Sequence, residues 1–304
     1  MRTRKGIGGV LGRRFALAGA LVALPALMAG TASAQSVDDL GSQFYSFVPA
    51  APTIEAPKSN DSLSLWQGEF KSGQDAYRAG DFTGALQHFQ RAADAGSTLA
   101  NWYLGNMYRL GRGVAADQGK AFGYYKAVAM AYDAEQPNTK LMRVTVDSLV
   151  RVADAYRAGV SEAGIDKDVP RALNLYSMAA GHGHPAALYG IGLIYLAGDG
   201  IQQRPDQGVK WLMRAARKRY APAETLLGDL YWDGKIVEQD RTRAIMWYRL
   251  AQQTARPDTQ PQITDRFDQI LSASTDEEKT NGEALAAQWS QQYPAALSKG
   301  PDEQ

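Results

Sequence analysis

The sequence has 304 residues, which suggests roughly two domains at ~150 residues each. Hydrophobic residues make up 45% of it, enough to bury a core, so a mainly disordered chain is excluded. It contains no cysteine, which excludes a disulfide scaffold, a thiolate zinc site and a cysteine nucleophile. Three histidines, His88, His182 and His184, leave little for metal chemistry, and 33 basic residues against 32 acidic ones show no strong charge bias.

Residues 1–34 predict a cleavable export signal. Five basic residues and no acidic one accompany an apolar run from Phe15 to Met28. That run is shorter than the ~20 residues needed to cross a bilayer, and the following Ala32-Ser-Ala34 fits the small-residue cleavage pattern. We therefore expect cleavage near Ala34/Gln35 and a periplasmic location, with both general and twin-arginine export left open.

Removal of this signal would change the charge balance. It would leave 28 basic and 32 acidic residues, and a mildly acidic chain is a poor candidate for binding nucleic acid. No second apolar run is long enough to anchor the mature chain in a membrane. Residues 35–61 carry three prolines among Ala, Ser and Thr, and they predict a flexible leader.

The remaining sequence repeats itself. The string DAYRAG occurs at 75–80 and again at 154–159, and LGNMY at 104–108 is echoed by IGLIY at 191–195 and LGDLY at 227–231. The interval from Ala187 to Ala223 is 36 residues. Periods of about 34–40 residues with two helical runs each predict an all-α fold, a right-handed α-solenoid of helix-turn-helix repeats.

One repeat shows how such a unit would pack. Leu104, Met107 and Tyr108 lie at i, i+3 and i+4, so they share one helix face. Gly105 lies beside them, where the missing side chain would let a neighbouring helix approach closely. Glycines follow the helix as left-handed terminators, and Asp117 is placed to cap the next helix.

The repeats predict about five helical hairpins across residues 62–254, at about 62–96, 98–134, 141–182, 184–219 and 221–254. Residues 255–293 predict two capping helices, near 262–272 and 276–292, and residues 294–304 a frayed tail. Ser274 and Glu277 have the spacing of a capping box at the start of the last helix.

These motifs resemble Sel-one-like repeats, longer relatives of the tetratricopeptide repeat. Within that class, the chain is similar to the ExoR-like family of exported regulators of exopolysaccharide production in alphaproteobacteria. The similarity lies in the order of the export signal, a short first hairpin, Asn106-Met-Tyr108, Lys210-Trp-Leu212 and a turn near Ser272–Asp276. Members of that family restrain a membrane sensor histidine kinase by contacting its periplasmic domain.

The resemblance implies a periplasmic interaction protein that binds and restrains such a kinase, with a periplasmic protease as a further partner. The alternative is a cell-envelope scaffold that organises peptidoglycan or polysaccharide enzymes. No catalytic or phosphate-binding motif occurs in the sequence, so we expect no enzyme activity and no cofactor. The GHGH string at 181–184 offers two ligands at most, and we interpret it as a turn and not as a metal site.

Basic and aromatic residues are the candidates for binding a partner, because they often anchor interfaces. Cations at a helix C-terminus also stabilise the helix dipole, and aromatic residues at helical spacing often belong to a core, so these structural interpretations stay open. The candidate partner-binding residues are Arg214, Arg217, Lys218, Arg219, Tyr108, Tyr195 and Trp232.

The export signal makes a direct prediction. Mass spectrometry of the exported protein should find a chain that begins at Gln35 or within a residue or two of it, because the small-residue pattern ends at Ala34. A cytoplasmic chain that retains Met1 would contradict both the signal and the periplasmic location.

Overall fold

The computed structural model describes residues 60–135, 139–198, 200–255 and 260–295. Its contacts separate Met1–Phe47 from Val48–Gln304, and every described residue belongs to the second unit. These residues form twelve α-helices and no strand, apart from one isolated bridge between Val160 and Ile165. The all-α fold class is therefore confirmed, while the export signal, nearly all of the leader and most of the tail lie outside the described residues.

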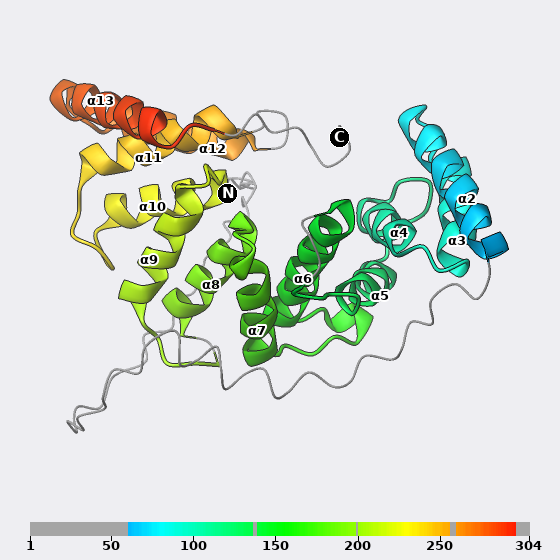
Figure 1. Ribbon diagram of the computed structural model, residues 1–304. Coiled ribbons are helices and arrows are strands. Elements are labelled where there is room, and N and C mark those ends of the chain that lie inside the picture. Colours follow the sequence, from blue (N-terminus) through cyan, green and yellow to red (C-terminus); the bar gives the residue numbers. More distant parts are fainter. Residues whose placement is uncertain (1–59, 136–138, 199, 256–259, 296–304) are drawn as a thin grey trace, which may run out of the picture. The chain divides into compact units, whose positions relative to one another are not determined.

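The helices form hairpins that stack in chain order (Figure 1). Within the described part, each odd-numbered helix up to α11 packs against the helix before it, and each hairpin packs against the next one. Helices α12 and α13 both pack on α11, where they cover the end of the stack. The helices are α2 (Asn60–Arg78), α3 (Phe82–Asp94), α4 (Thr98–Leu110), α5 (Gln118–Ala129), α6 (Lys140–Ala158), α7 (Val169–Gly181), α8 (Pro185–Ala197), α9 (Pro205–Ala216), α10 (Ala221–Asp233), α11 (Arg241–Thr254), α12 (Pro261–Ser272) and α13 (Asp276–Gln292).

Aspartate caps mark the start of the second helix in four of the five hairpins. Asp81, Asp117, Asp168 and Asp240 each accept a hydrogen bond from the backbone N–H three residues further on. This satisfies a donor that has no partner inside the helix. The exception is α9, which begins after Arg204 without a side-chain cap.

Helix ends follow the same local rules. Gly111, Gly198 and Gly234 close α4, α8 and α10 in the left-handed conformation, as a glycine without a Cβ allows. One cap differs from expectation. The capping box of α13 joins Thr275 and Glu278, one residue later than the predicted pair, because Ser274 instead donates its hydroxyl hydrogen bond to the carbonyl of Ile270 in α12.

A glycine in the first helix allows the two helices of a hairpin to meet. A Cβ on Gly105 would lie 2.9 Å from the Tyr125 ring of α5, and a Cβ on Gly228 would lie 2.5 Å from the Tyr248 ring of α11. Both separations are shorter than ordinary van der Waals contact, so only glycine fits without movement of the ring. The close approach predicted for Gly105 is therefore confirmed.

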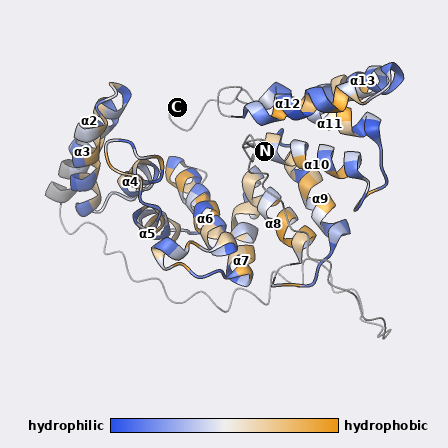
Figure 2. Cartoon of the chain, turned by 180° about the vertical axis from the view of Figure 1, so that it is seen from behind, coloured by the Kyte–Doolittle hydropathy of each residue, from blue (hydrophilic) through white to orange (hydrophobic). Residues whose placement is uncertain are grey.

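The core runs through the stack instead of filling one centre. Hydrophobic and hydrophilic residues share most helices in Figure 2, as expected of helices with one buried side. One buried cluster joins α2–α6, a second joins α6–α11 with α13, and a third joins α10–α12. Each hairpin thus buries its apolar face against its neighbours, the arrangement typical of repeat proteins.

Gly228 provides a test of the close contact. Replacement Gly228→Val should lower the free energy of unfolding by about 2–4 kcal/mol, because a branched side chain would overlap the Tyr248 ring. Chemical denaturation followed by circular dichroism measures this. In the matched control Gly123→Ala, on α5, the new Cβ meets no atom within 4 Å. This replacement should leave the free energy of unfolding unchanged or raise it slightly. Equal stability of the two variants would refute the packing role.

Candidate interaction surface

Three of the four predicted basic residues lie exposed at the end of α9. The guanidinium of Arg214 lies 4.2 Å from the centre of the Trp211 ring, and that of Arg217 lies 5.9 Å from the Tyr293 ring. Lys218 places its Nζ 3.5 Å from the position that a Cβ on Gly183 would occupy. Arg214, Arg217 and Lys218 are therefore exposed residues spaced at i, i+3 and i+4 at the end of α9, a group here called the α9 basic surface.

Arg219 is a correction to that set, because its side chain is only 4% exposed. A left-handed backbone, with φ of 56°, turns it inward. It donates hydrogen bonds to Glu224 Oε1 at 2.8 Å and to the Gln253 side chain at 3.0 Å, and also to the carbonyl oxygens of Leu250 and Tyr293. Arg219 thus joins the α9–α10 turn to α11 and the end of α13, and it is not available to a partner.

Glu224 is fully buried beside Arg219. Burial raises the pKa of this carboxyl, and the Arg219 guanidinium counteracts the rise by favouring the charged form. A second hydrogen bond from the Thr254 hydroxyl, at 3.1 Å, occupies the other carboxylate oxygen. The pair is therefore a structural connection inside the fold.

The predicted aromatic residues lie near the C-terminal ends of first helices. Tyr108 of α4 stacks on Tyr124 with ring centres 5.6 Å apart, and the Lys120 ammonium lies 5.3 Å from its ring. Trp232 of α10 lies under the Arg241 guanidinium at 5.1 Å. Both rings are half-buried and already contact a cation, so their structural role and a role in binding can coexist.

Tyr195 of α8 is different. Equivalent tyrosines in the third and fifth hairpins, Tyr156 and Tyr231, lie under an arginine of the following helix at 4.9 and 5.4 Å. The residue in that place after Tyr195 is Gln207, which has no charge. Within the described residues, Tyr195 is therefore a half-buried ring of this series without a covering cation.

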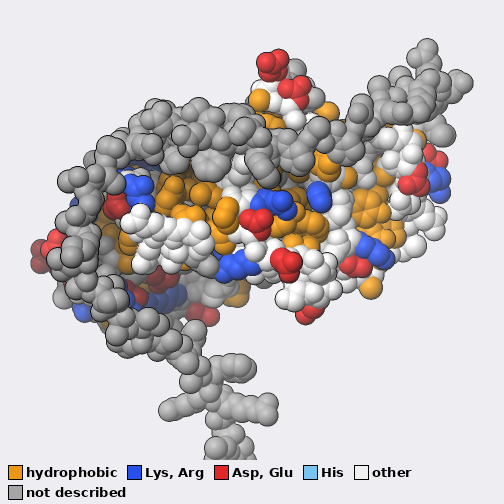
Figure 3. Space-filling model, turned by 90° about the horizontal axis from the view of Figure 1, so that it is seen from below, with side chains coloured by type: hydrophobic (Ala, Val, Ile, Leu, Met, Phe, Trp, Pro, Cys, Tyr) orange, Lys and Arg blue, Asp and Glu red, His pale blue; other side chains and the backbone are white. Residues whose placement is uncertain are grey.

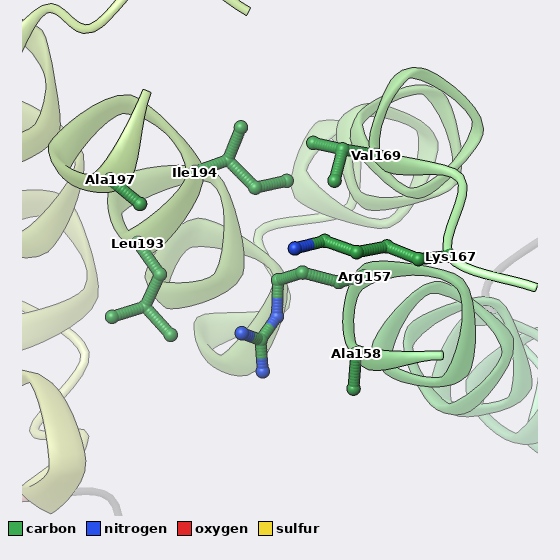
Figure 4. Close-up of a pocket in the computed structure, with 7 residues that line it drawn as sticks. All are labelled: Arg157, Ala158, Lys167, Val169, Leu193, Ile194 and Ala197. Carbon is green, nitrogen blue, oxygen red and sulfur yellow. The ribbon is translucent and has the colours of Figure 1, made fainter. Parts of the chain in front are cut away.

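A small pocket lies between the end of α6, the start of α7 and the C-terminal end of α8 (Figure 4). Arg157 and Lys167 contribute charge to its lining, while Val169, Leu193 and Ile194 make it apolar. Its volume is about 220 Å³. Ligand sites usually enclose about 300–1,000 Å³, so this pocket is too small for a typical small-molecule site.

A group of polar side chains on α6 and the neighbouring first helices was not predicted from the sequence, and it is here called the α6 polar cluster. Asp147, Arg151 and Asp154 lie at i, i+4 and i+7, a spacing visible in the sequence that places them on one helix face. The rings of Tyr189 and Tyr220 meet beside them, with centres 5.6 Å apart. The cluster consists of Asp147, Arg151, Asp154 and Arg157 on α6, His184 and Tyr189 at the start of α8, and Tyr220 before α10.

Burial alters the acid–base behaviour of this cluster. It lowers the pKa of His184, which favours the neutral imidazole, and it raises the pKa of Tyr189. Burial also raises the pKa of Tyr220 to about 12, with the Asp154 carboxylate as a second cause. All three side chains are therefore neutral near pH 7, and the arginines and aspartates carry the charge of the cluster.

The described residues contain no group of three potential metal ligands, and none of their helices is long and apolar enough to cross a membrane. The two histidines of the GHGH string have different surroundings. His182 Nε2 lies 2.9 Å from the Tyr132 hydroxyl, whereas His184 belongs to the α6 polar cluster. Gly183 between them has a φ of 72°, which identifies the string as a turn.

Charge of both signs is distributed over the face shown in Figure 3. Hydrophobic side chains form patches there, and basic and acidic side chains interrupt them. Such a mixed surface does not resemble the continuous basic stripe that binds a nucleic-acid backbone. It is compatible with an interface that combines apolar contact with selected charges.

These observations define a class of protein. Stacked helical hairpins, with Asp caps and left-handed glycines at equivalent places, form a helix-turn-helix solenoid related to tetratricopeptide repeats. The model of the Sel1 repeat family matches five segments of the chain, residues 70–97, 98–133, 146–184, 185–220 and 221–251. The chain belongs to the Sel1 repeat family.

Two curated relatives share a name. The chain is 28% identical over 211 residues to the exopolysaccharide production negative regulator of Rhizobium meliloti (strain 1021). That alignment covers 69% of this chain and 76% of that protein. It is 31% identical over 165 residues to the protein of the same name in Rhizobium leguminosarum bv. viciae, which covers 54% of this chain and 61% of the relative.

The fold also matches a solved structure. The crystal structure of a Sel1 repeat protein from Oxalobacter formigenes aligns with a TM-score of 0.53 at 24% identity. The alignment covers 76% of this chain and 91% of that one. This similarity supports the solenoid fold.

The buried connection of Arg219 can be tested. Replacement Arg219→Met should lower the free energy of unfolding by about 3–5 kcal/mol, because it would leave the buried Glu224 carboxylate without its partner. The neighbouring Lys218→Met is the matched control, and a change at an exposed residue should stay within about 0.5 kcal/mol. Urea denaturation of both variants at pH 7 provides the comparison. A stable Arg219→Met protein would contradict the structural role assigned here.

Proposed function

We propose that this chain is a non-catalytic regulator of exopolysaccharide production that acts by binding another protein. The main support for this proposal is the 28% identity to a negative regulator of exopolysaccharide production, over 76% of that protein. The five Sel1 repeats support it, because stacked hairpins offer an extended surface to a partner.

The partner that we propose is the periplasmic domain of a membrane sensor histidine kinase, which the chain would restrain after export. The family resemblance supports this partner, and the signal-like residues 1–34 support a periplasmic location. A periplasmic protease is a second proposed partner, one that would remove the regulator.

The use of carboxylates inside the hairpins supports a non-catalytic role. At equivalent positions, an Asn or Asp of the first helix accepts a hydrogen bond from a tyrosine hydroxyl of the second. These hydrogen bonds hold the two helices together, so the paired side chains are already used inside the fold. The pairs are Asn106–Tyr125, Asp154–Tyr176 and Asp229–Tyr248.

A direct test uses a strain that lacks this chain together with the purified mature protein. Deletion should raise exopolysaccharide output, and the purified protein should bind the isolated kinase ectodomain in a titration. Recovery of peptidoglycan or polysaccharide enzymes from membrane extract, without binding to the ectodomain, would instead support the envelope scaffold. Unchanged exopolysaccharide output in the deletion strain would overturn the proposed regulation.

The α9 basic surface predicts how association with the ectodomain depends on salt. The double replacement Arg217→Ala and Lys218→Ala should slow association and flatten its salt dependence, because exposed charges steer encounter more than they hold the complex. Stopped-flow association rates at several salt concentrations measure the effect.

The matched control removes two exposed lysines elsewhere, Lys126→Ala and Lys235→Ala, with the same loss of charge. Its association rate should keep most of the wild-type salt dependence, and the helical circular dichroism spectrum should be unchanged in both variants. An equal effect in the two variants would remove the α9 basic surface from the interface.

A further inference from the structure

The α9 basic surface consists of cations that form no ion pair with the described residues. Arg214, Arg217 and Lys218 are all exposed, and the two guanidinium groups lie against the aromatic rings of Trp211 and Tyr293. In the second, third and fifth hairpins, by contrast, an exposed cation of the second helix pairs with the aspartate cap of that helix. A carboxylate brought to the α9 basic surface would therefore find charge that the described fold leaves unmatched.

The chain leaves the described fold beside this surface. Tyr293 follows α13, and its backbone N–H donates to the carbonyl of Trp289 at 2.8 Å. The buried Arg219 donates to the Tyr293 carbonyl at 3.4 Å and to the Ser290 hydroxyl at 3.5 Å. These bonds fix the end of α13 to the α9–α10 turn, where the Tyr293 ring lies 5.9 Å from the Arg217 guanidinium. The described residues end two positions later.

The sequence that follows carries more acidic than basic charge. Residues 296–304 contain one cation, Lys299, and then the two adjacent acids Asp302 and Glu303. Asp302 lies seven positions after Ala295, and an extended chain covers about 23 Å in seven residues at ~3.3 Å each. The α9 basic surface spans four residues, about 6 Å along a helix at ~1.5 Å per residue. Both acids can therefore reach every cation of the surface.

We propose that the α9 basic surface binds residues 296–304 of its own chain, through the carboxylates of Asp302 and Glu303. Exposed ion pairs are weak one by one, but a short tether keeps the segment at a local concentration on the order of millimolar. The contact thus needs only weak attraction to cover the surface. A partner that presents acidic groups to the same cations must displace this segment first. The proposal goes beyond the proposed function and needs no particular partner.

Carbodiimide coupling of the purified mature chain tests this contact. The reagent joins a carboxylate to an amine that lies against it, with loss of one water, and mass spectrometry of the digested protein locates the new amide bond. The carboxylates of Asp302 and Glu303 should couple to Lys218. Coupling to Lys126 and Lys235, exposed lysines of the second and fifth hairpins, should be several-fold lower. Acetylation of the same lysines in a parallel sample corrects for differences in amine reactivity.

Matched variants identify the charges that attract the segment. The double replacement Arg214→Gln and Arg217→Gln keeps Lys218 and should lower its coupling about threefold, because two neighbouring cations are lost. The double replacement Lys126→Gln and Lys235→Gln removes the same charge and should leave coupling at Lys218 unchanged. Sodium chloride at about 0.5 M should lower coupling in the wild type, because salt screens exposed charges.

Three outcomes would overturn the proposal: equal coupling at all three lysines, unchanged coupling at Lys218 in the Arg214 and Arg217 variant, or coupling between two chains. A mixture of unlabelled and isotope-labelled chains reveals the last case, since a bond between chains joins one peptide of each kind.

The consequence for the proposed function is tested separately. The double replacement Asp302→Asn and Glu303→Gln should raise the rate of association with the kinase ectodomain about threefold, because the cations are then uncovered. The matched control Glu238→Gln and Glu277→Gln, at two exposed acids, should raise it less. An equal rise in both variants would overturn the competition. Selective coupling at Lys218 without ectodomain binding would overturn only the kinase as partner, whereas ectodomain binding without selective coupling would overturn only the contact proposed here.

Discussion

The close approach of two helices at one glycine governs the geometry of the hairpins. In the second, fourth and fifth hairpins the residue that meets this glycine lies twenty positions later, as in Gly105–Tyr125, Gly192–Leu212 and Gly228–Tyr248. In these three hairpins the left-handed glycine ends the first helix, and the second helix begins eight positions after the first one ends. The first hairpin has a shorter turn, and there Gly73 meets Phe89 sixteen positions later. Hairpins with the same inner contact present similar outer faces to their neighbours, which lets the units stack.

The fourth hairpin keeps this constraint while changing its chemistry. Where the second, third and fifth hairpins hold a polar residue facing a tyrosine hydroxyl, it holds Leu193 and Leu212. A change on one side alone would leave a buried polar group without a partner, so the two sides differ together. Gly192 and Gly208 then meet across α8 and α9, where a Cβ on either would lie close to the carbonyl of the other.

The sequence predicted the features that depend on near neighbours. Periodicity located the hairpins, and capping rules identified Asp117 and the glycine that ends the helix before it, which is Gly111 in the structure. Features that depend on distant residues were missed. In the sequence Arg219 looked like part of a basic surface. Its burial could not be predicted, because its partners include the carbonyl of Tyr293, 74 residues away. The α6 polar cluster showed its charge spacing, but only packing reveals which of its atoms, such as Arg151 Nε, lack a partner.

Neighbouring charged residues in this chain therefore have different roles, and the hydrogen bonds that each one forms distinguish them. Arg217 and Arg219 are two residues apart, yet only Arg219 has its guanidinium occupied by Glu224 and by backbone carbonyls. A charge whose bonds are all inside the fold stabilises the stack and cannot be given to a partner without loss of stability. The groups left for recognition are those that the repeats hold in place but do not satisfy. Among the described residues, Arg214, Arg217 and Lys218 at the end of α9 are exposed and form no ion pair, so contact with them would break no such bond inside the fold.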